Sequence, residues 1–437
     1  MGELVERHWE ARFEGPTRAD RRWGDYRAFV PDPLCGWEFS VPASLAGDIA
    51  AVEHRILALN GAVDVAGLEG LGRFLLRAEA VGSSWLEGLA VSPRRLAAAA
   101  AASEQGLDVG DRLAAEVAAN IEALQQATAT ATRGDRFEGS DLLAAHRALM
   151  RHSTTPEVAG VLRINQNWIG GSAYTPIGSR FVPPPPEKVA PLIADLIDYM
   201  ASGEHSPLTQ AALAHAQFET IHPFGDGNGR TGRGLIHVVL ARRSLAPRFV
   251  PPVSVVLARR STQYTDALQE FAHVGPPDSA DRQAAAVAWL ECFTSAMGHA
   301  CARTADYRDA VLDLQHRWRQ QVGPLRADSS AVRLMRRLPG SPVVTVDSAS
   351  RLLGVSPDRV GPALNTLAAA GVISPRQIGR RRYRVFEARD VFALWQATDS
   401  DLAGALGAEG ASERIAQARG TRPDADARLD DFDEDRH

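Results

Sequence analysis

Cysteine is scarce in this 437-residue chain, which contains only Cys35, Cys292 and Cys301. The three form no Cys-x-x-Cys pair and have no neighbouring histidine at the spacing of a metal site. The sequence therefore predicts neither a disulfide framework nor a zinc centre. We expect free, buried thiols in a reducing compartment.

Long apolar runs and lysine are also missing. No segment approaches the roughly 18 apolar residues of a membrane span, and the first residues lack the apolar core of a signal peptide. Lys188 is the sole lysine, and the formal charge of -5 gives no overall attraction to nucleic acid or an anionic membrane. We expect a cytoplasmic protein with no membrane partner.

The length predicts two or three domains, and the composition changes along the chain mark their limits. Residues 1–45 hold aromatic side chains among prolines and charges, which indicates an extended docking arm. Helical periodicity fills 46–135 and 136–322, and a smaller unit covers 330–400. Residues 401–437 are rich in Ala, Gly and Asp, which is typical of a disordered acidic tail.

Residues 330–400 show three short helical patterns followed by two strands, with Gly379 at the turn between them. This order predicts a winged-helix-like domain. Arg376, Arg380, Arg381 and Arg382 would make a basic wing, which opens a DNA-binding regulator as an alternative function. Because winged helices also dock proteins, DNA binding is the less favoured interpretation.

The densest group of chemically active residues lies between His222 and Arg233. Pro223 should end the preceding helix at His222, and a second helix should begin near Arg230. The intervening glycines, Gly225, Gly227 and Gly229, allow positive φ and a close approach of backbone N–H groups to a ligand.

A helix that begins after such a loop offers an anion site at its N-terminus. Arg230 and Arg233, three residues apart, could bind successive phosphates, and Asp226 suits a magnesium ion that bridges them. His222 has the near-neutral pKa of a general base. The stretch therefore predicts transfer of a phosphorus-containing group to a nucleophile.

Two other phosphate-binding motifs are excluded here. Residues 227–232 match G-x-G-x-x-G, but a helix precedes them where the dinucleotide fold requires a strand. The Walker motif fails because no lysine follows the glycines.

Every specified position of the Fic motif, H-x-F-x-[DE]-G-N-G-R-x-x-R, is matched from His222 to Arg233. The chain resembles the Fic family from about residue 30 to 300, including Gly160, Arg163 and the flap around Trp168. The resemblance implies an all-α fold with a β-hairpin flap. It also implies transfer of AMP from ATP to a Ser, Thr or Tyr hydroxyl of a target protein.

The resemblance also assigns roles by position. His222 would take the hydroxyl proton and Asp226 would hold Mg²⁺. The nucleotide would be bound by Ile169, Gly170, Gly171, Ser172, Gly227, Asn228, Gly229, Arg230, Arg233 and Tyr264. The flap residues among them would also align the target chain by strand addition. The family pattern allows a homodimer.

Ser83, Glu87 and Gly88 fit the family's inhibitory pattern, [ST]-x-x-x-E-[GN], with Gly88 as a helix C-cap. The resemblance implies that Glu87 pairs with Arg233 and competes with the γ-phosphate. From the residues alone, a solvated side chain is the favoured interpretation of Glu87. A further enzymatic alternative is regulated removal of AMP, with Glu87 positioning water.

Overall fold

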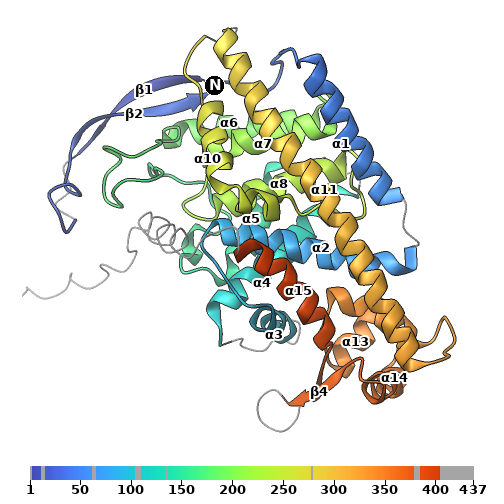
Figure 1. Ribbon diagram of the computed structural model, residues 1–437. Helices are drawn as coiled ribbons and strands as arrows, with labels where there is room; N and C mark the ends of the chain where they lie inside the picture. The colour runs from blue at the N-terminus through green and yellow to red at the C-terminus, as the bar shows by residue number, and fades with distance from the viewer. Residues whose placement is uncertain are drawn as a thin grey trace, which may run out of the picture.

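The computed structural model describes residues 2–10, 15–61, 65–103, 110–133, 136–276, 279–377 and 384–403. This part of the chain is mostly helical, which confirms the all-α prediction (Figure 1). The helices up to residue 322 are α1 (Ala43–Gly61), α2 (Val65–Leu86), α3 (Pro93–Ser103), α4 (Arg112–Ala131), α5 (Gly139–Leu149), α6 (Pro186–Ala201), α7 (Pro207–Ile221), α8 (Asn228–Arg242), α9 (Val253–Arg259), α10 (Ser261–Phe271) and α11 (Ala280–Val322). Within the described residues, no helix is both long and apolar enough to cross a membrane.

Helices α7 and α8 form the centre of the largest hydrophobic core. Nearly every residue of both helices is buried, because α1, α6 and α11 cover α7 while α2 and α4 cover α8. The run from Leu235 to Leu240 in α8 is apolar nearly all round, as expected for a helix segment enclosed on every side. The turn that joins them is therefore held on a rigid base.

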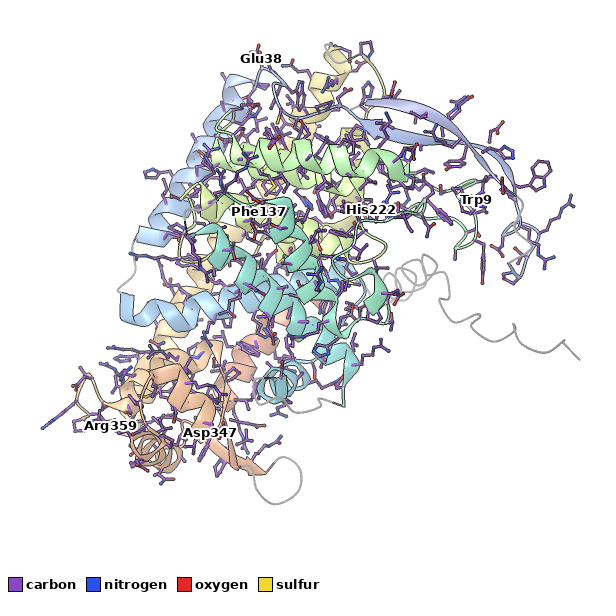
Figure 2. The ribbon with its side chains drawn as sticks, turned by 180° about the vertical axis from the view of Figure 1, so that it is seen from behind. Trp9, Glu38, Phe137, His222, Asp347 and Arg359 are labelled. Carbon is purple, nitrogen blue, oxygen red and sulfur yellow. The ribbon has the colours of Figure 1, made fainter. Side chains whose placement is uncertain are left out.

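The N-terminal arm, predicted only as an extended segment, contains two regular strands. β1 (Gly2–Trp9) and β2 (Gly24–Pro31) form an antiparallel hairpin. Gly2 lies opposite Pro31, and Trp9 lies opposite Gly24. We call the described residues of 2–31 the arm. It projects from the helical body, with Trp9 toward its outer part (Figure 2).

The flap, residues 163–182, also differs in detail. It pairs through one isolated antiparallel bridge, between Ile169 and Phe181, rather than through two regular strands. Gly170 and Gly171 take left-handed φ values of 75° and 78°, which interrupts the ladder at the turn. The prolines from 183 onward lack the N–H groups that would extend it.

The C-terminal part contains α12 (Ser330–Arg337), β3 (Val343–Val344), α13 (Val346–Leu353), α14 (Pro357–Ala369), β4 (Ser374–Gln377), β5 (Arg384–Glu387) and α15 (Arg389–Ala403). The three helices and the β4–β5 pair agree with the predicted order, and β3 adds a short third strand beside β5. Helix α15 continues to Ala403, so the tail does not begin at 401. Gly379, Arg380, Arg381, Arg382 and the tail from 404 lie outside the described residues.

Helix α2 connects this C-terminal part to the central helices. Leu71 and Phe74, on its N-terminal half, belong to the same hydrophobic cluster as the C-terminal helices. Ala78 and Val81, on its second half, pack with residues of α4 and α9. Gly70 approaches so closely that a Cβ there would lie 2.2 Å from the Arg336 carbonyl oxygen. One helix therefore spans both parts of the molecule and ends beside the turn after α7.

Candidate active site

The turn between α7 and α8 begins at His222, which has left-handed backbone angles of φ 49° and ψ 60°. Helix α8 begins at Asn228, earlier than the predicted Arg230. Gly227 takes a positive φ of 75°, whereas Gly225 and Gly229 do not, so the expectation of positive φ holds at one of the three glycines. The side chain of Asn228 closes the turn, because its Oδ1 accepts from Phe224 N and its Nδ2 donates to Phe224 O, both at 2.8 Å.

The left-handed conformation of His222 is held from the flap. Arg163 Nε donates to the His222 carbonyl oxygen at 2.8 Å, and Asn167 Nδ2 donates to the same oxygen at 3.2 Å. A non-glycine residue in this region costs about 1–3 kcal/mol and persists only where its surroundings enforce it. Such strain is common at active sites, and here two side chains maintain it.

The imidazole of His222 has the tautomer of a base. Its Nδ1 lies 3.4 Å from the Glu219 carbonyl oxygen, which can only accept, so Nδ1 carries the proton and Nε2 keeps its lone pair. Burial lowers the pKa of His222 to about 4, and the nearby positive charge of Arg163 acts in the same direction.

The lowered pKa of His222 predicts the pH at which activity is lost on acidification. Only the neutral imidazole can accept a proton, and a pKa near 4 keeps it neutral down to that pH. We expect kcat/KM of a catalytically active variant to stay level from pH 8 to pH 6 and to fall only toward pH 4. The measurement is a pH–rate profile, with circular dichroism at each pH to verify folding. An acid limb near the ordinary histidine value of about 6.5 would contradict this assignment.

Arg233 lies on α8, and its side chain is 3 % exposed to solvent. Its Nη2 lies 2.7 Å from Glu87 Oε1, as the implied pairing requires. Its Nε donates to Ser83 Oγ at 2.8 Å, and Nη2 also donates to the Ser83 carbonyl oxygen at 2.9 Å. Burial is the largest single effect and would lower the pKa of Arg233, but Glu87, Tyr264 and Glu219 together raise it overall.

Glu87 stands over the first turn of α8. A Cβ built on Gly229 would lie 2.0 Å from Glu87 Oε1, so only glycine permits this approach. Gly88, with φ 75°, ends the turn after α2, and its N–H donates to the Trp85 carbonyl oxygen at 2.9 Å. The carboxylate therefore occupies the positive end of a helix, which is the place where a phosphate would bind.

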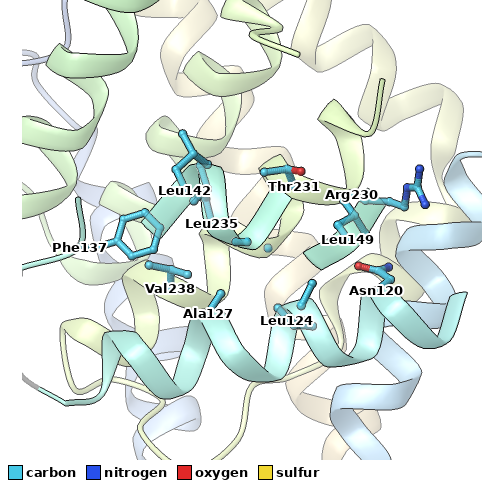
Figure 3. A pocket seen from close by; sticks show the side chains of 13 residues that line it. Asn120, Leu124, Ala127, Phe137, Leu142, Leu149, Arg230, Thr231, Leu235 and Val238 are labelled. Atoms are coloured by element: carbon cyan, nitrogen blue, oxygen red, sulfur yellow. The ribbon is translucent and has the colours of Figure 1, made fainter. Parts of the chain in front are cut away.

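Arg230 was expected to bind phosphate beside Arg233, but the structure directs it elsewhere. Its Nη1 lies 2.8 Å from Glu116 Oε1 of α4, and the two side chains are 3 % and 5 % exposed. Figure 3 shows Arg230 and Thr231 at the edge of a mainly apolar cavity of about 30 Å³, with the guanidinium directed away from it. In this arrangement Arg230 joins α8 to α4, and its phosphate contact stays a prediction.

This buried ion pair predicts a large effect on stability. Replacing Glu116 by alanine leaves the Arg230 charge buried beside an apolar cavity, which should reduce the free energy of unfolding by about 3–5 kcal/mol. Glu122 of the same helix is the matched control, because its pair with Arg151 is 42 % and 47 % exposed and should contribute about 0–1 kcal/mol. Denaturant unfolding of Glu116→Ala and Glu122→Ala compares them, and equal losses would contradict the assignment.

Asp226 lies in the loop before α8 and is half-buried. Its Oδ1 accepts from Gly227 N at 2.7 Å, and its Oδ2 accepts from the Thr155 hydroxyl at 3.2 Å. The described residues contain no group of three or more His, Cys, Asp or Glu side chains that could hold a metal alone. Magnesium commonly takes one or two protein carboxylates and completes its shell with phosphate and water, so this single carboxylate fits that ion.

His146 of α5 supports this loop, and sequence reasoning did not identify it as a site residue. Its Nδ1 accepts from Gly160 N at 2.8 Å, so its Nε2 is protonated and donates to the Asp226 carbonyl oxygen at 2.9 Å. Burial lowers the pKa of His146 to about 4, which keeps this tautomer neutral. The only feature of the sequence that could have indicated this role is a single histidine among the apolar residues of a helical pattern.

Tyr264, predicted to contact the nucleotide, lies in the core instead. It is 4 % exposed, and its hydroxyl lies 2.9 Å from His215 Nε2 while also interacting with Arg233. His215 is fully buried, as expected for a hydrogen-bonded core residue. Tyr264 therefore supports Arg233 from the interior.

The flap lies against the same turn. Asn167 Nδ2 donates to the carbonyl oxygens of His222 and Phe224, which fixes the base of the flap to the turn. The predicted flap residues, Ile169 to Ser172, follow directly. The structure thus brings together His222, Asp226, Gly229, Arg233 and Glu87. Tyr264 reaches this group only through Arg233, from the interior, and Arg230 is directed to α4.

Residues 136–240 match the model of the Fic/DOC family. The chain contains a Fic domain. Curated relatives of this segment include protein adenylyltransferase fic-1 of Caenorhabditis briggsae, which is 32 % identical over 114 residues, or 25 % of this chain and 20 % of the relative. Protein adenylyltransferase Fic of Drosophila willistoni is 38 % identical over 114 residues, or 25 % and 21 %. The chain thus spans about a fifth of the length of these relatives.

Solved structures of Fic proteins are also similar to this chain. One is a Fic family protein from Desulfovibrio desulfuricans G20, with a TM-score of 0.48, 24 % identity, and coverage of 80 % of this chain and 97 % of that one. Another is Fic-1 from Caenorhabditis elegans, with a TM-score of 0.48, 21 % identity, and coverage of 61 % and 74 %. The matched Fic domain, 136–240, holds the whole His222–Arg233 turn.

Proposed function

We propose that the Fic domain transfers AMP from ATP to a hydroxyl side chain of a target protein. The observation that supports this most is the pairing of a neutral imidazole with an anion site. His222 keeps a free Nε2 lone pair, and the N-terminus of α8 begins six residues later with Arg233 on its second turn. The relatives named protein adenylyltransferases agree with it.

In the proposed step the target hydroxyl oxygen attacks the α-phosphorus of ATP. A new O–P bond forms, the bond from the α-phosphorus to the bridging oxygen breaks, and pyrophosphate leaves. His222 Nε2 accepts the hydroxyl proton, while the strained backbone held by Arg163 and Asn167 fixes the direction of the ring. The backbone N–H groups of Asn228 and Gly229 and the Arg233 guanidinium receive the phosphates.

Magnesium would be held by Asp226, where it would neutralise phosphate charge. The carboxylate is positioned for this by Gly227 N and the Thr155 hydroxyl. His146 fixes the backbone of the same residue through its carbonyl oxygen. These contacts orient Asp226 independently of any bound ion.

Glu87 is proposed to inhibit this transfer. Its carboxylate forms an ion pair with Arg233 and occupies the positive end of α8, so the terminal phosphates of ATP have no cationic partner there. ATP that binds beside it would lack the orientation needed for attack at the α-phosphorus. An ion pair in this position acts as a switch, and its contribution to stability is secondary.

The remaining partners are proposed from the same arrangement. The flap would align an extended segment of the target by strand addition, in the cytoplasm. A homodimer is compatible with the family pattern. For DNA binding, Arg376 is paired with Glu387 at 3.2 Å, which uses one of the four wing arginines. The structure thus gives no added reason to favour DNA binding.

The function is tested by incubating Glu87→Gly protein with magnesium, α-labelled ATP and a cell lysate, followed by identification of the labelled proteins. We expect label on protein that survives denaturation, and a mass gain of one AMP on a hydroxyl residue. Folded Glu87→Gly protein that labels nothing, itself included, would contradict the proposal.

A further inference from the structure

The arm contacts the tip of the flap at two points. The Ser172 hydroxyl donates to Asp20 Oδ1 at 2.6 Å, and the Thr175 hydroxyl donates to the Arg22 carbonyl oxygen at 3.0 Å. Thr175 has no solvent exposure even though it lies in a loop. The arm therefore covers the flap tip.

The contact continues along the arm toward the body of the molecule. Trp9 packs edge-on against Trp168, with ring centroids 5.3 Å apart. Nearer the body, Phe29 N donates to the Val182 carbonyl oxygen at 2.8 Å. Figure 1 shows the β1–β2 hairpin running beside the flap loops for most of its length. The arm thus supports the flap from base to tip.

The flap has little regular structure of its own to resist distortion. It holds one β-bridge, and two successive glycines follow it in left-handed conformation. Ser172 comes next, and Trp168 Nε1 donates to its carbonyl oxygen at 2.6 Å. Ser172 also accepts from Tyr174 N at 3.1 Å through its hydroxyl. The Ser172 hydroxyl therefore accepts a hydrogen bond from within the flap and donates one to the arm.

Asp20 is suited to hold that hydroxyl. Its hydrogen bonds, first from Ser172 and then from Thr17, lower the pKa of its carboxyl group, so it is ionised at neutral pH. A charged acceptor forms a shorter and stronger hydrogen bond than a neutral one. Both Thr17 contacts come from the arm itself, at 3.1 Å from the backbone and 2.6 Å from the hydroxyl, and they orient the carboxylate toward the flap.

We propose that the arm is part of the transfer site and that Asp20 is a positioning residue. Through Ser172 it fixes the backbone of Gly170 and Gly171 in the shape that receives the nucleotide and the target chain. This inference rests on the proposed function of the flap. It assigns to the N-terminal hairpin a role that lies outside the matched Fic segment of 136–240.

The test uses the full chain carrying Glu87→Gly, with Asp20→Ala, Ser172→Ala, the pair of both, and Asp20→Asn. Asp25→Ala is the matched control, because Asp25 is an arm carboxylate whose bond, 2.7 Å to His8, stays within the arm. Calorimetry with ATP and magnesium gives Kd, and label transfer gives KM and kcat. We expect Asp20→Ala to weaken ATP binding and raise KM by about tenfold to a hundredfold, the effect of one lost hydrogen bond to a charged group.

Three further results separate positioning from general damage to the fold. The double variant should match the single ones, since both remove the same bond. Asp20→Asn keeps an acceptor oxygen and should restore most of the affinity, and Asp25→Ala should leave it unchanged. Effects of Asp20→Ala and Ser172→Ala that multiply, or Asp20→Ala behaving like Asp25→Ala, would overturn the proposal.

A readout that needs no catalysis distinguishes this proposal from the function itself. Arg180 is exposed on the returning side of the flap. Trypsin should cleave after it faster in Asp20→Ala than in Asp25→Ala. Equal cleavage rates would overturn the positioning role even if AMP transfer is found. Faster cleavage without any transfer would support the role of Asp20 and refute the proposed reaction.

Discussion

Replacing Glu87 by glycine should increase the rate of AMP transfer by about 5-fold to 150-fold, the usual range for coupling between a regulatory contact and a site. The carboxylate holds Arg233 at 2.7 Å and stands over Gly229 at the N-terminus of α8. Its removal frees both positive groups for the terminal phosphates of ATP. The measurement is the initial rate of label incorporation from α-labelled ATP by wild type and variant.

A glycine at this position also loosens the backbone, so a second variant is needed. Glu87→Ala removes the carboxylate and keeps ordinary backbone stiffness, and it should activate as much as Glu87→Gly. Glu87→Gln keeps the size and one acceptor oxygen but loses the charge, and we expect an intermediate rate. Equal rates in wild type, Glu87→Ala and Glu87→Gly would show that Glu87 has no inhibitory role.

Replacing His222 by alanine should reduce transfer by about 10²–10⁴-fold in the Glu87→Gly background. The reason is the lost acceptor for the hydroxyl proton, since Nε2 is the ring atom that carries the free lone pair. Single-turnover incorporation of label, with enzyme in excess over labelled ATP and saturating target, measures this loss at the chemical step.

The control for His222→Ala is His54→Ala, since His54 is exposed on α1 and should be silent. Calorimetry should show that His222→Ala still binds ATP within about threefold, because its ring receives a proton and holds no phosphate. If transfer persists in His222→Ala at the rate of the parent, His222 is not the base and the proposed step is wrong.

The turn was predictable from sequence because its chemistry is local. His222, Asp226 and Arg233 lie within one helix–loop–helix, and proline and glycine fix its shape through backbone rules that act over a few residues. The ion pair of Glu87 with Arg233 spans 146 residues, and it was inferred through the family resemblance. Periodicity placed Glu87 at the end of α2 but could not say which helix that end meets.

Other positions differed because their partners are distant in sequence. Arg230 was expected to face the ligand with Arg233, but a residue offset of three separates side chains by about 60° around a helix, and Glu116 of α4 takes Arg230. Tyr264 lies in the core, where its hydroxyl forms a hydrogen bond with the buried His215. The arm formed a hairpin that its prolines and charges concealed, because strand pairing between β1 and β2 decides it.

In the proposed function, this turn transfers AMP and Glu87 restrains the transfer. The most direct measurement compares ATP labelled at the α-phosphate with ATP labelled at the γ-phosphate, in parallel, using wild type, Glu87→Gly and Glu87→Gly with His222→Ala. We expect protein-bound label from α-labelled ATP alone, strongest in Glu87→Gly and lost with His222→Ala. Protein-bound label from γ-labelled ATP would contradict it, because the reaction would then be phosphate transfer.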